Sequence, residues 1–239
     1  MLTTEGGLLQ GRLRYRQPAQ GFRSGIEPVF LAASIPALPG QHVLEAGTGA
    51  GAALLCLHAR IPDVESTGVE RDPDLAGLAA NNAAENGFSR MRIVTGDILA
   101  TALAASFDHV MTNPPYHASG PASPVAARER AKRGSAPLLR AWIARLAASV
   151  RPRGTMTVVV PSGAVPTCVE AMAESGCACT VVFPLWPRQG NDAKLVLVRG
   201  VRGSRAPMRL AAGLTLHEAD GRFTDAAQAV LRGGSPLLL

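Results

Sequence analysis

Four consecutive residues, Asn113-Pro114-Pro115-Tyr116, carry the most specific chemical signal in the chain. The side-chain oxygen of Asn113 and the main-chain carbonyl of Pro114 can each accept a hydrogen bond from one hydrogen of a planar amino group, which favours a pyramidal nitrogen. The two prolines hold the backbone extended and set the direction of these carbonyls. Tyr116 offers a flat face against which a displaced nucleobase can stack. The motif therefore predicts chemistry at an exocyclic amine, although Asn-Pro alone also fits an ordinary strand-exit turn.

A glycine-rich loop lies upstream, in Glu45-Ala46-Gly47-Thr48-Gly49-Ala50-Gly51. Glycines at alternate positions allow a tight turn and the close approach of a ligand to the backbone. Glu70 stands 21 residues beyond Gly49. A doubly wound fold places an acidic residue at about this spacing against a ribose. The loop and the acid together predict a cofactor that contains a nucleoside.

The loop alone leaves two cofactors open. Residues 47–52 also satisfy the looser dinucleotide pattern, in which a helix N-terminus holds a pyrophosphate. Glu45 would repel a pyrophosphate and suits S-adenosylmethionine, whose sulfonium is positive; alternatively, its carboxylate caps nearby N–H groups. Asp97, followed by Ile98, is expected to accept a hydrogen bond from an adenine amine, and it also fits the N-cap of a following helix.

Short apolar runs alternate with Ala-rich stretches along the chain, which indicates strands and helices in turn. The expected strands are His42–Ala46, Ser66–Glu70, Met91–Thr95, Phe107–Thr112, Thr155–Pro161, Thr180–Leu185 and Lys194–Val198. The expected helices are Ala50–Arg60, Pro73–Asn86, Ile98–Ala104 and Ala136–Val150. Strands that are apolar throughout predict a mainly parallel sheet covered on both faces. We therefore expect a single α/β domain, doubly wound on a seven-stranded sheet, with the site in loops at the strand ends.

Two segments stand outside this alternation, residues 1–39 and residues 117–135. Long segments without regular structure are usually functional or mobile. The second segment ends in basic residues, for which two interpretations remain open: contact with nucleic-acid phosphates or a solvated helix start. The candidate nucleic-acid-binding residues are Arg128, Arg130, Lys132 and Arg133.

The composition bounds the class of protein. The chain has 239 residues, 47% of them hydrophobic and 18% charged, which excludes a disordered polymer and permits one hydrophobic core. No continuous apolar run reaches the roughly 18 residues of a membrane span, and the first residues do not resemble a secretory signal, so we expect a cytoplasmic protein. The four cysteines are irregularly spaced in apolar surroundings, which predicts buried thiols and no metal site.

The net charge of +6 divides unevenly along the chain. Residues 27–108 hold 4 basic and 10 acidic residues, whereas the remainder holds 20 and 8. This division suits a cationic cofactor in the acidic part and a polyanionic acceptor at the basic flanks.

Taken together, these motifs resemble the class I S-adenosylmethionine-dependent methyltransferases that act on amino groups. The resemblance rests on residues 45–51, Glu70, Gly96-Asp97 and Phe107-Asp108 leading to Asn113–Tyr116. Residues 20–33 and 214–225 are similar to the bacterial tRNA(Val) adenine-N6-methyltransferase-like group, although Glu27 stands where members commonly carry Asp.

The resemblance implies a Rossmann-like methyltransferase domain at residues 40–239 and a segment at 1–39 that covers the cofactor. It implies transfer to adenine in tRNA with S-adenosyl-L-homocysteine as product, by a protein that is a monomer or weak dimer and needs neither metal nor membrane. The implied catalytic residues are Asn113, Pro114, Pro115 and Tyr116. The implied cofactor contacts are Gly25, Glu27, Glu45, Ala46, Gly47, Thr48, Gly49, Gly51, Glu70, Arg71, Asp97, Ile98 and Asn113.

Other functions remain open at this point. The same amine motif serves the amide of a protein glutamine and the N2 amine of guanine in rRNA. An NAD-dependent dehydrogenase would use the glycine loop but would leave Asn113–Tyr116 unexplained. A non-catalytic RNA-binding module is a further alternative, which the complete motif disfavours.

Overall fold

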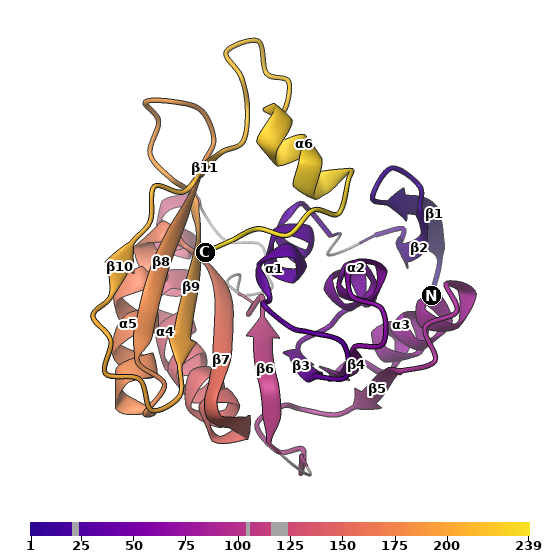
Figure 1. The fold of residues 1–239 in the computed structure, drawn as a ribbon, viewed down its shortest axis with the longest axis horizontal. Helices are drawn as coiled ribbons and strands as arrows, with labels where there is room; N and C mark the ends of the chain where they lie inside the picture. Colours follow the sequence, from indigo (N-terminus) through magenta and orange to yellow (C-terminus); the bar gives the residue numbers. More distant parts are fainter. Residues whose placement is uncertain (21–23, 104–105, 116–123) are drawn as a thin grey trace.

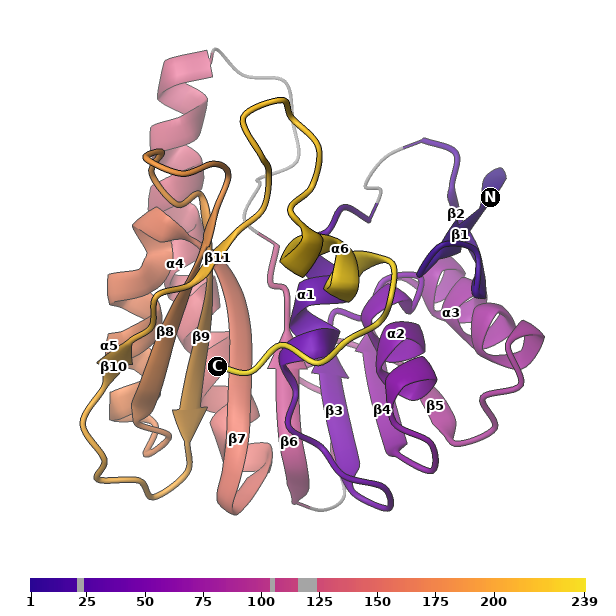
Figure 2. The ribbon, with the colours of Figure 1, turned by 45° about the horizontal axis from the view of Figure 1, so that its top comes forward.

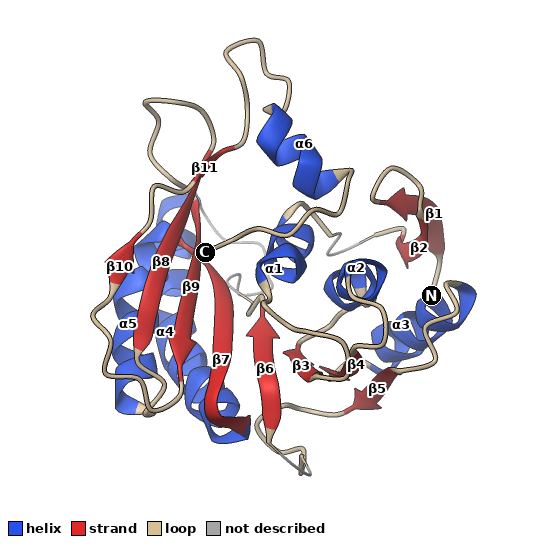
Figure 3. Cartoon of the chain, viewed as in Figure 1, coloured by secondary structure: helices blue, strands red, loops and turns tan. Residues whose placement is uncertain are grey.

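A central sheet runs through the molecule with helices on both faces (Figures 1 and 3). The computed structural model describes residues 1–20, 24–103, 106–115 and 124–239, and within 124–135 it describes the backbone alone. The strands of this sheet are β3 (His42–Ala46), β4 (Glu65–Glu70), β5 (Met91–Thr95), β6 (Phe107–Thr112), β7 (Val150–Pro161), β8 (Cys179–Trp186), β9 (Leu195–Val201), β10 (Arg209–Leu210) and β11 (Leu214–Thr215).

The seven expected strands are confirmed, and they lie in the order β5-β4-β3-β6-β7-β9-β8. β9 is antiparallel to both of its neighbours, and the other six strands share one direction. The two-residue strands β10 and β11 pair with β8 at the edge. Successive strands β3, β4 and β5 extend to one side of β3, while β6 lies on its other side. The carboxyl ends of β3 and β6 therefore adjoin at a topological switch point, where ligands bind in folds of this kind.

Helices cover both faces of the sheet. They are α1 (Glu27–Ser34), α2 (Ala52–Arg60), α3 (Pro73–Glu85), α4 (Pro124–Ser149), α5 (Val165–Glu174) and α6 (Asp225–Leu231). Alternate strand residues feed two cores. Val43 and Met111 pack on the side of α1 and α2, whereas Leu44 and Val110 pack on the side of α4 and α5. Burial on both faces explains why these strands are apolar throughout.

Helix α3 follows the signals in its sequence. The Asp72 carboxylate accepts hydrogen bonds from the N–H groups of Asp74 and Leu75, and Pro73 occupies the first turn. Gly87, just beyond the helix, has a φ of +74°, a conformation that favours glycine. Both ends of α3 were therefore predictable from local chemistry.

Two expected features differ from the structure. The predicted helix Ile98–Ala104 is wrong, because residues 98–100 form a turn and residues 101–103 are not helical. Asp97 stabilises this turn: its carboxylate accepts from Leu99 N–H at 2.9 Å and its carbonyl accepts from Ala100 N–H at 3.0 Å. The predicted loop at 117–135 is also wrong in part, because the backbone from Pro124 onward belongs to α4; residues 116–123 lie outside the described part of the chain.

The N-terminal segment, residues 1–39, contains regular structure that its sequence does not predict. Strands β1 (Thr3–Leu8) and β2 (Leu13–Pro18) form an antiparallel hairpin, and α1 is buried along nearly its whole length. The C-terminal segment crosses back over this region, with α6 beside α1 (Figure 2). Leu237 N–H donates to the Ala33 carbonyl at 2.8 Å, and the Arg12 guanidinium donates to the Gly233 carbonyl at 2.7 Å. The C-terminal segment thus packs on α1, and the hairpin packs on α2 and α3.

The four cysteines are buried free thiols, as predicted. Burial raises the pKa of Cys56 and of Cys168 to about 12. Among the helices of the described residues, none combines the length and the apolar character that crossing a membrane would require.

Candidate active site

The predicted site segments meet at one edge of the sheet, at the carboxyl ends of β3, β4, β5 and β6. The register places Ala46 beside both Val69 and Thr112, and it places Glu70 beside Thr95. Gly47 N–H donates to the Val69 carbonyl at 2.8 Å, and Gly96 N–H donates to the Glu70 carbonyl at 2.8 Å. Along this edge the order is therefore Asp97 after β5, Glu70 at the end of β4, the glycine loop after β3 and Asn113 after β6.

The three loop glycines are all left-handed but face different surroundings. Their φ angles are +68° at Gly47, +56° at Gly49 and +88° at Gly51. A Cβ on Gly47 would lie 2.9 Å from the Trp142 ring, and one on Gly51 would lie 2.9 Å from the Met91 methyl. A Cβ on Gly49 would meet no described atom within 4 Å. Gly47 and Gly51 thus allow the loop to pack against the protein, and Gly49 faces the open side, where a ligand can approach.

Glu45 is a buried acid beside this loop, with a side chain only 4% exposed. The Thr48 hydroxyl donates to its Oε2 at 2.5 Å. Burial raises the pKa of Glu45 to about 8; the Thr48 hydrogen bond opposes this shift and the charge of Glu70 adds to it. No basic side chain in the described part of the chain pairs with it. A cation placed here would favour the ionised carboxylate.

Glu70 joins the glycine loop to the start of α3. Its Oε2 accepts from Gly49 N–H at 2.8 Å, and its Oε1 accepts from Asp72 N–H at 2.9 Å. A carboxylate has about four lone-pair sites, so Glu70 retains acceptors for the hydroxyls of a ligand. Arg71, the next residue, is exposed.

Asp97 caps a turn and not a helix, which corrects one of its two interpretations. Its main-chain carbonyl accepts from the Thr101 hydroxyl at 2.7 Å, and the Thr101 carbonyl accepts from the Arg145 guanidinium at 2.8 Å. This chain of bonds ties the turn to α4. Ile98 is 3% exposed and packs into the core, so of this pair only Asp97 is partly open to solvent.

Asn113 directly follows a fixed point at the end of β6. Thr112 is fully buried, and its hydroxyl donates to the Ala46 carbonyl at 2.9 Å, which ties the end of β6 to the end of β3. Asn113 is half-buried, Pro114 is buried and Pro115 is exposed. Tyr116 lies outside the described residues. So do the side chains of the expected nucleic-acid contacts Arg128, Arg130, Lys132 and Arg133.

The N-terminal segment reaches the same region. The Tyr15 hydroxyl and the Ser24 hydroxyl share a hydrogen bond at 2.7 Å, and Ser24 N–H donates to the Gln17 side chain at 3.2 Å. Burial raises the pKa of Tyr15, and the nearby charge of Glu45 raises it further. Strand β2 thus positions Ser24, which immediately precedes Gly25, where a Cβ would collide with the Glu27 carboxylate.

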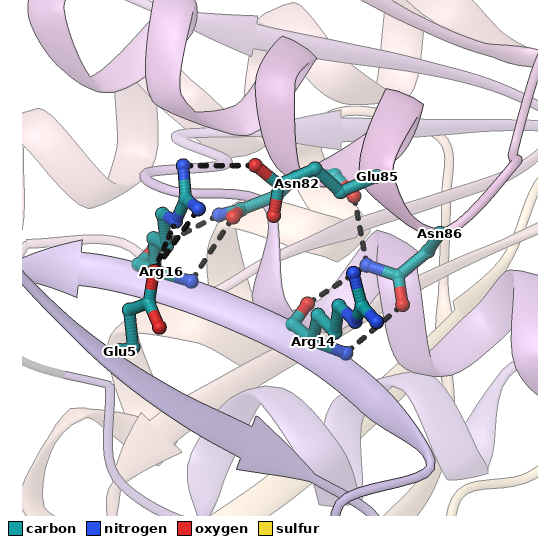
Figure 4. Close-up of polar contacts among 6 residues, drawn as sticks. All are labelled: Glu5, Arg14, Arg16, Asn82, Glu85 and Asn86. Atoms are coloured by element: carbon teal, nitrogen blue, oxygen red, sulfur yellow. Dashed lines mark hydrogen bonds and ion pairs between the residues drawn. The ribbon is translucent and has the colours of Figure 1, made fainter.

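Sequence reasoning missed Asn82, which is fully buried on α3. Its amide donates to the Ala50 carbonyl in the glycine loop at 2.9 Å and to the Arg16 carbonyl at 2.9 Å, and it accepts from Arg16 N–H at 3.0 Å. Asn86 makes the corresponding pair of bonds with Arg14 (Figure 4). Two asparagines four residues apart share one helix face, and this spacing could have suggested the clamp.

The groups around the glycine loop suit a cationic nucleoside better than a dinucleotide. Gly49 leaves open space beside the loop, Glu70 has free acceptors, and Glu45 is a buried acid with no basic partner among the described side chains. A pyrophosphate here would be repelled by the Glu70 carboxylate, and it would hold the buried Glu45 in its protonated form without gaining a cationic partner. S-adenosylmethionine carries a positive sulfonium and a ribose, which match these groups.

Known proteins bear out this match. Residues 28–160, more than half of the chain, match the family described as Methyltransferase small domain. A protein named tRNA1(Val) (adenine(37)-N6)-methyltransferase from Aeromonas hydrophila subsp. hydrophila is 29% identical over 205 residues, covering 84% of this chain and 85% of that protein. A protein of the same name from the Flavobacteriaceae bacterium strain 3519-10 is 30% identical over 161 residues, covering 67% and 68%.

A solved structure agrees on the fold. The crystal structure of a predicted O-methyltransferase from Agrobacterium tumefaciens superposes with a TM-score of 0.71 at 24% identity, covering 89% of this chain and 98% of that one. The methyltransferase match also decides between the two cofactors that the glycine loop had left open. The chain belongs to the methyltransferase small domain family and is an S-adenosylmethionine-dependent methyltransferase.

Proposed function

We propose that the chain methylates the exocyclic N6 amine of an adenine in tRNA. The observation that carries the proposal is the position of Asn113 and Pro114, which follow β6 at the switch point beside the glycine loop. Asn-Pro-Pro-Tyr presents two acceptors to a planar amine. Two further points support the acceptor: the names of the relatives and the concentration of basic residues outside 27–108.

The proposed chemistry depends on positioning. When bound, S-adenosylmethionine supplies an electrophilic methyl group on a positively charged sulfur. The Asn113 side-chain oxygen and the Pro114 carbonyl each accept a hydrogen bond from one N–H of the amine, which aims the nitrogen lone pair at the methyl group. Tyr116 stacks on the base. Holding two reactants in line replaces a bimolecular encounter and supplies most of the rate gain. The alkylated nitrogen is acidic enough to give its proton to water, so the site needs no strong base.

The N-terminal segment has a place in the same proposal. Residues 1–39 cover the cofactor held by the domain at 40–239, with Gly25 and Glu27 closest to it. The support is the bonding of Ser24 to Tyr15 and Gln17, which anchors Ser24 directly before Gly25. Asn82 bonds both Arg16 of β2 and Ala50, so β2 lies beside the glycine loop that follows β3.

Mass spectrometry of nucleosides tests the acceptor. The purified chain is incubated with isotope-labelled S-adenosylmethionine and unfractionated tRNA, or with a release factor in place of the tRNA. We expect labelled N6-methyladenosine from the tRNA and no label in the release factor. Label on guanine N2 or on a glutamine would replace the proposal with one of those acceptors.

Substitution of Asn113 tests the mechanism. Asn113→Ala is expected to abolish turnover, because the acceptor amine loses a hydrogen-bond acceptor, and to leave the affinity for S-adenosylhomocysteine within a few-fold of the unaltered protein, because the other cofactor contacts remain. Asn81→Ala, at an exposed asparagine on α3, is the matched control and keeps full activity. A fully active Asn113→Ala protein would overturn the role of the motif.

A further inference from the structure

A pocket of about 500 Å³ lies between the loop that follows β8 and the loop that follows β11. Arg188, Asn191, Asp192 and Lys194 line it from the first loop, and His217 lines it from the second. Its volume lies within the range of pockets that hold small ligands. None of these residues belongs to the cofactor site described above.

The pocket lies on the acceptor side of the switch point. β8 runs in the same direction as β6, so its carboxyl end lies at the same edge of the sheet as Asn113, and the loops after β8 and β11 rise above that edge (Figure 2). Ser162 N–H, just after β7, donates to the Lys194 carbonyl at 3.0 Å. Neighbouring strands lie about 4.8 Å apart, which puts Lys194 about 10 Å and Arg188 about 15 Å along the edge from Asn113.

The chemistry of the pocket favours a phosphate group. Arg188 and Lys194 are exposed cations, and neither makes an ion pair with any residue that the structure describes. Asn191 adds an amide donor, and Asp192 is the single acid in the lining. The nearby Asp220 is paired with Arg222 at 2.7 Å, so its charge is locally balanced. Two unpaired cations against one acid leave a positive pocket, which is the usual setting for phosphate contacts.

The His217 ring forms a fixed wall of the pocket. Its Nδ1 lies 3.1 Å from the Pro187 carbonyl, and the ring stacks on Phe223 with the centroids 4.5 Å apart. The two loops are therefore joined at Pro187 and His217. Arg188 and Lys194 project from a supported frame and not from two independent loops.

We infer that this pocket binds the phosphodiester backbone of the RNA acceptor, a few nucleotides from the adenine at Asn113. The inference rests on the proposed function and adds a second point of contact to it. Backbone contacts fix the register of a nucleic acid on a protein, while the reacting base is selected elsewhere. The pocket would therefore orient the RNA at the same edge of the sheet, on the other side of Asn113 from the glycine loop.

Salt-dependent binding tests the inference. Unfractionated tRNA is titrated with the unaltered protein and with Arg188→Ala, Lys194→Ala and the double variant at several salt concentrations. Each lost phosphate contact lowers the slope of log affinity against log salt by about 0.7–0.9, so the double variant should lose between about 1.4 and 1.8. We also expect at least a tenfold rise in the KM for tRNA, with kcat and the affinity for S-adenosylhomocysteine unchanged.

Arg205→Ala is the matched control, because Arg205 is exposed and precedes β10 at the opposite edge of the sheet. It removes the same charge and should not change the slope. If the unaltered protein methylates tRNA and the double variant keeps the full slope, the pocket is not an RNA site and the proposed function stands. If the unaltered protein binds S-adenosylhomocysteine but neither binds nor methylates tRNA, the proposed function fails, and this inference with it.

Discussion

Gly49 has a left-handed backbone and open space beside it, so its role in stability and its role in cofactor binding can be measured separately. An alanine there adopts a φ near +56° at a cost of about 1 kcal/mol, and its methyl group points into the volume assigned to the cofactor. We predict that Gly49→Ala lowers the free energy of unfolding by about 1 kcal/mol and weakens S-adenosylhomocysteine binding at least tenfold. Urea unfolding and calorimetry measure the two effects.

Gly87→Ala provides the matched control for Gly49→Ala. Gly87 has a φ of +74° and equally open surroundings, but it ends α3 at a distance from the glycine loop. It should lose a similar amount of stability and keep its affinity for S-adenosylhomocysteine. Equal losses of affinity in the two variants would show that Gly49 acts through stability alone.

Glu45 should make folding depend on pH. Its pKa is about 8 in the folded protein and near 4.5 when unfolded, so the folded state favours the protonated carboxyl. This stabilising contribution is complete below about pH 4.5 and is lost as the pH rises through 8. We predict that Glu45→Gln gains stability relative to the unaltered protein by up to about 3 kcal/mol between pH 5 and pH 8. A difference that stays constant over this range would contradict the buried, neutral carboxyl.

At the scale of elements, the hairpin and the glycine loop depend on one side chain of α3. Asn82 bonds both Arg16 in β2 and Ala50 in the loop, whereas Asn86 bonds Arg14 and makes no bond to the loop. Asn82→Ala leaves buried backbone groups unpaired, at a cost of about 2–3 kcal/mol. We predict faster amide exchange in residues 13–17 together with at least fivefold weaker binding of S-adenosylhomocysteine.

Asn86→Ala separates the docking of the hairpin from the support of the loop. It should speed exchange in residues 13–17 as well, because the Arg14 bonds are lost, but it should leave cofactor binding unchanged. Full cofactor affinity in Asn82→Ala would show that the Ala50 bond does not position the loop.

The elements with local signals were predictable, and those that depend on distant contacts were not. The ends of α3 follow from Asp72, Pro73 and Gly87, which act within a few residues. After Asp97 an Ala-rich run suggested a helix, but Asp97 and the Thr101 hydroxyl, with Arg145 of α4 holding Thr101, fix a turn. Propensity is a weak prior, and tertiary bonds of this kind override it.

At the scale of the whole molecule, one part of the site was predictable from the sequence and another part was not. The glycine loop, Glu70 and Asp97 were predictable because each ends a strand, and parallel strands bring their carboxyl ends to one edge. The basic pocket could not be predicted, because its residues come from distant parts of the sequence: Lys194 precedes β9, and His217 follows β11. The two meet only through the pairing of β8 with β9 and β11. The division of charge along the sequence indicated a basic acceptor side but could not place it.

The two ends of the chain stabilise each other through α6, which was also not evident from the sequence. Ala227 is fully buried against the layer of α1, whereas its neighbour Ala226 is exposed. An aspartate at 227 would bury an unpaired charge. Ala227→Asp should therefore lower the free energy of unfolding by about 3 kcal/mol, or by the cost of releasing α6 if that cost is smaller. Ala226→Asp, in the first turn of the same helix, should be neutral or slightly stabilising.

Hydrogen exchange distinguishes release of α6 from general loss of stability. The segment after α6 donates to Ala33 and accepts from Arg12, so its release should expose amides in both the C-terminal segment and the β1–β2 hairpin. We expect faster exchange in residues 8–13 and 225–237 of Ala227→Asp, with the strands β3 and β6 still protected. Uniform acceleration across the sheet would mean that α6 belongs to the global folding unit and does not act as a separate clasp between the termini.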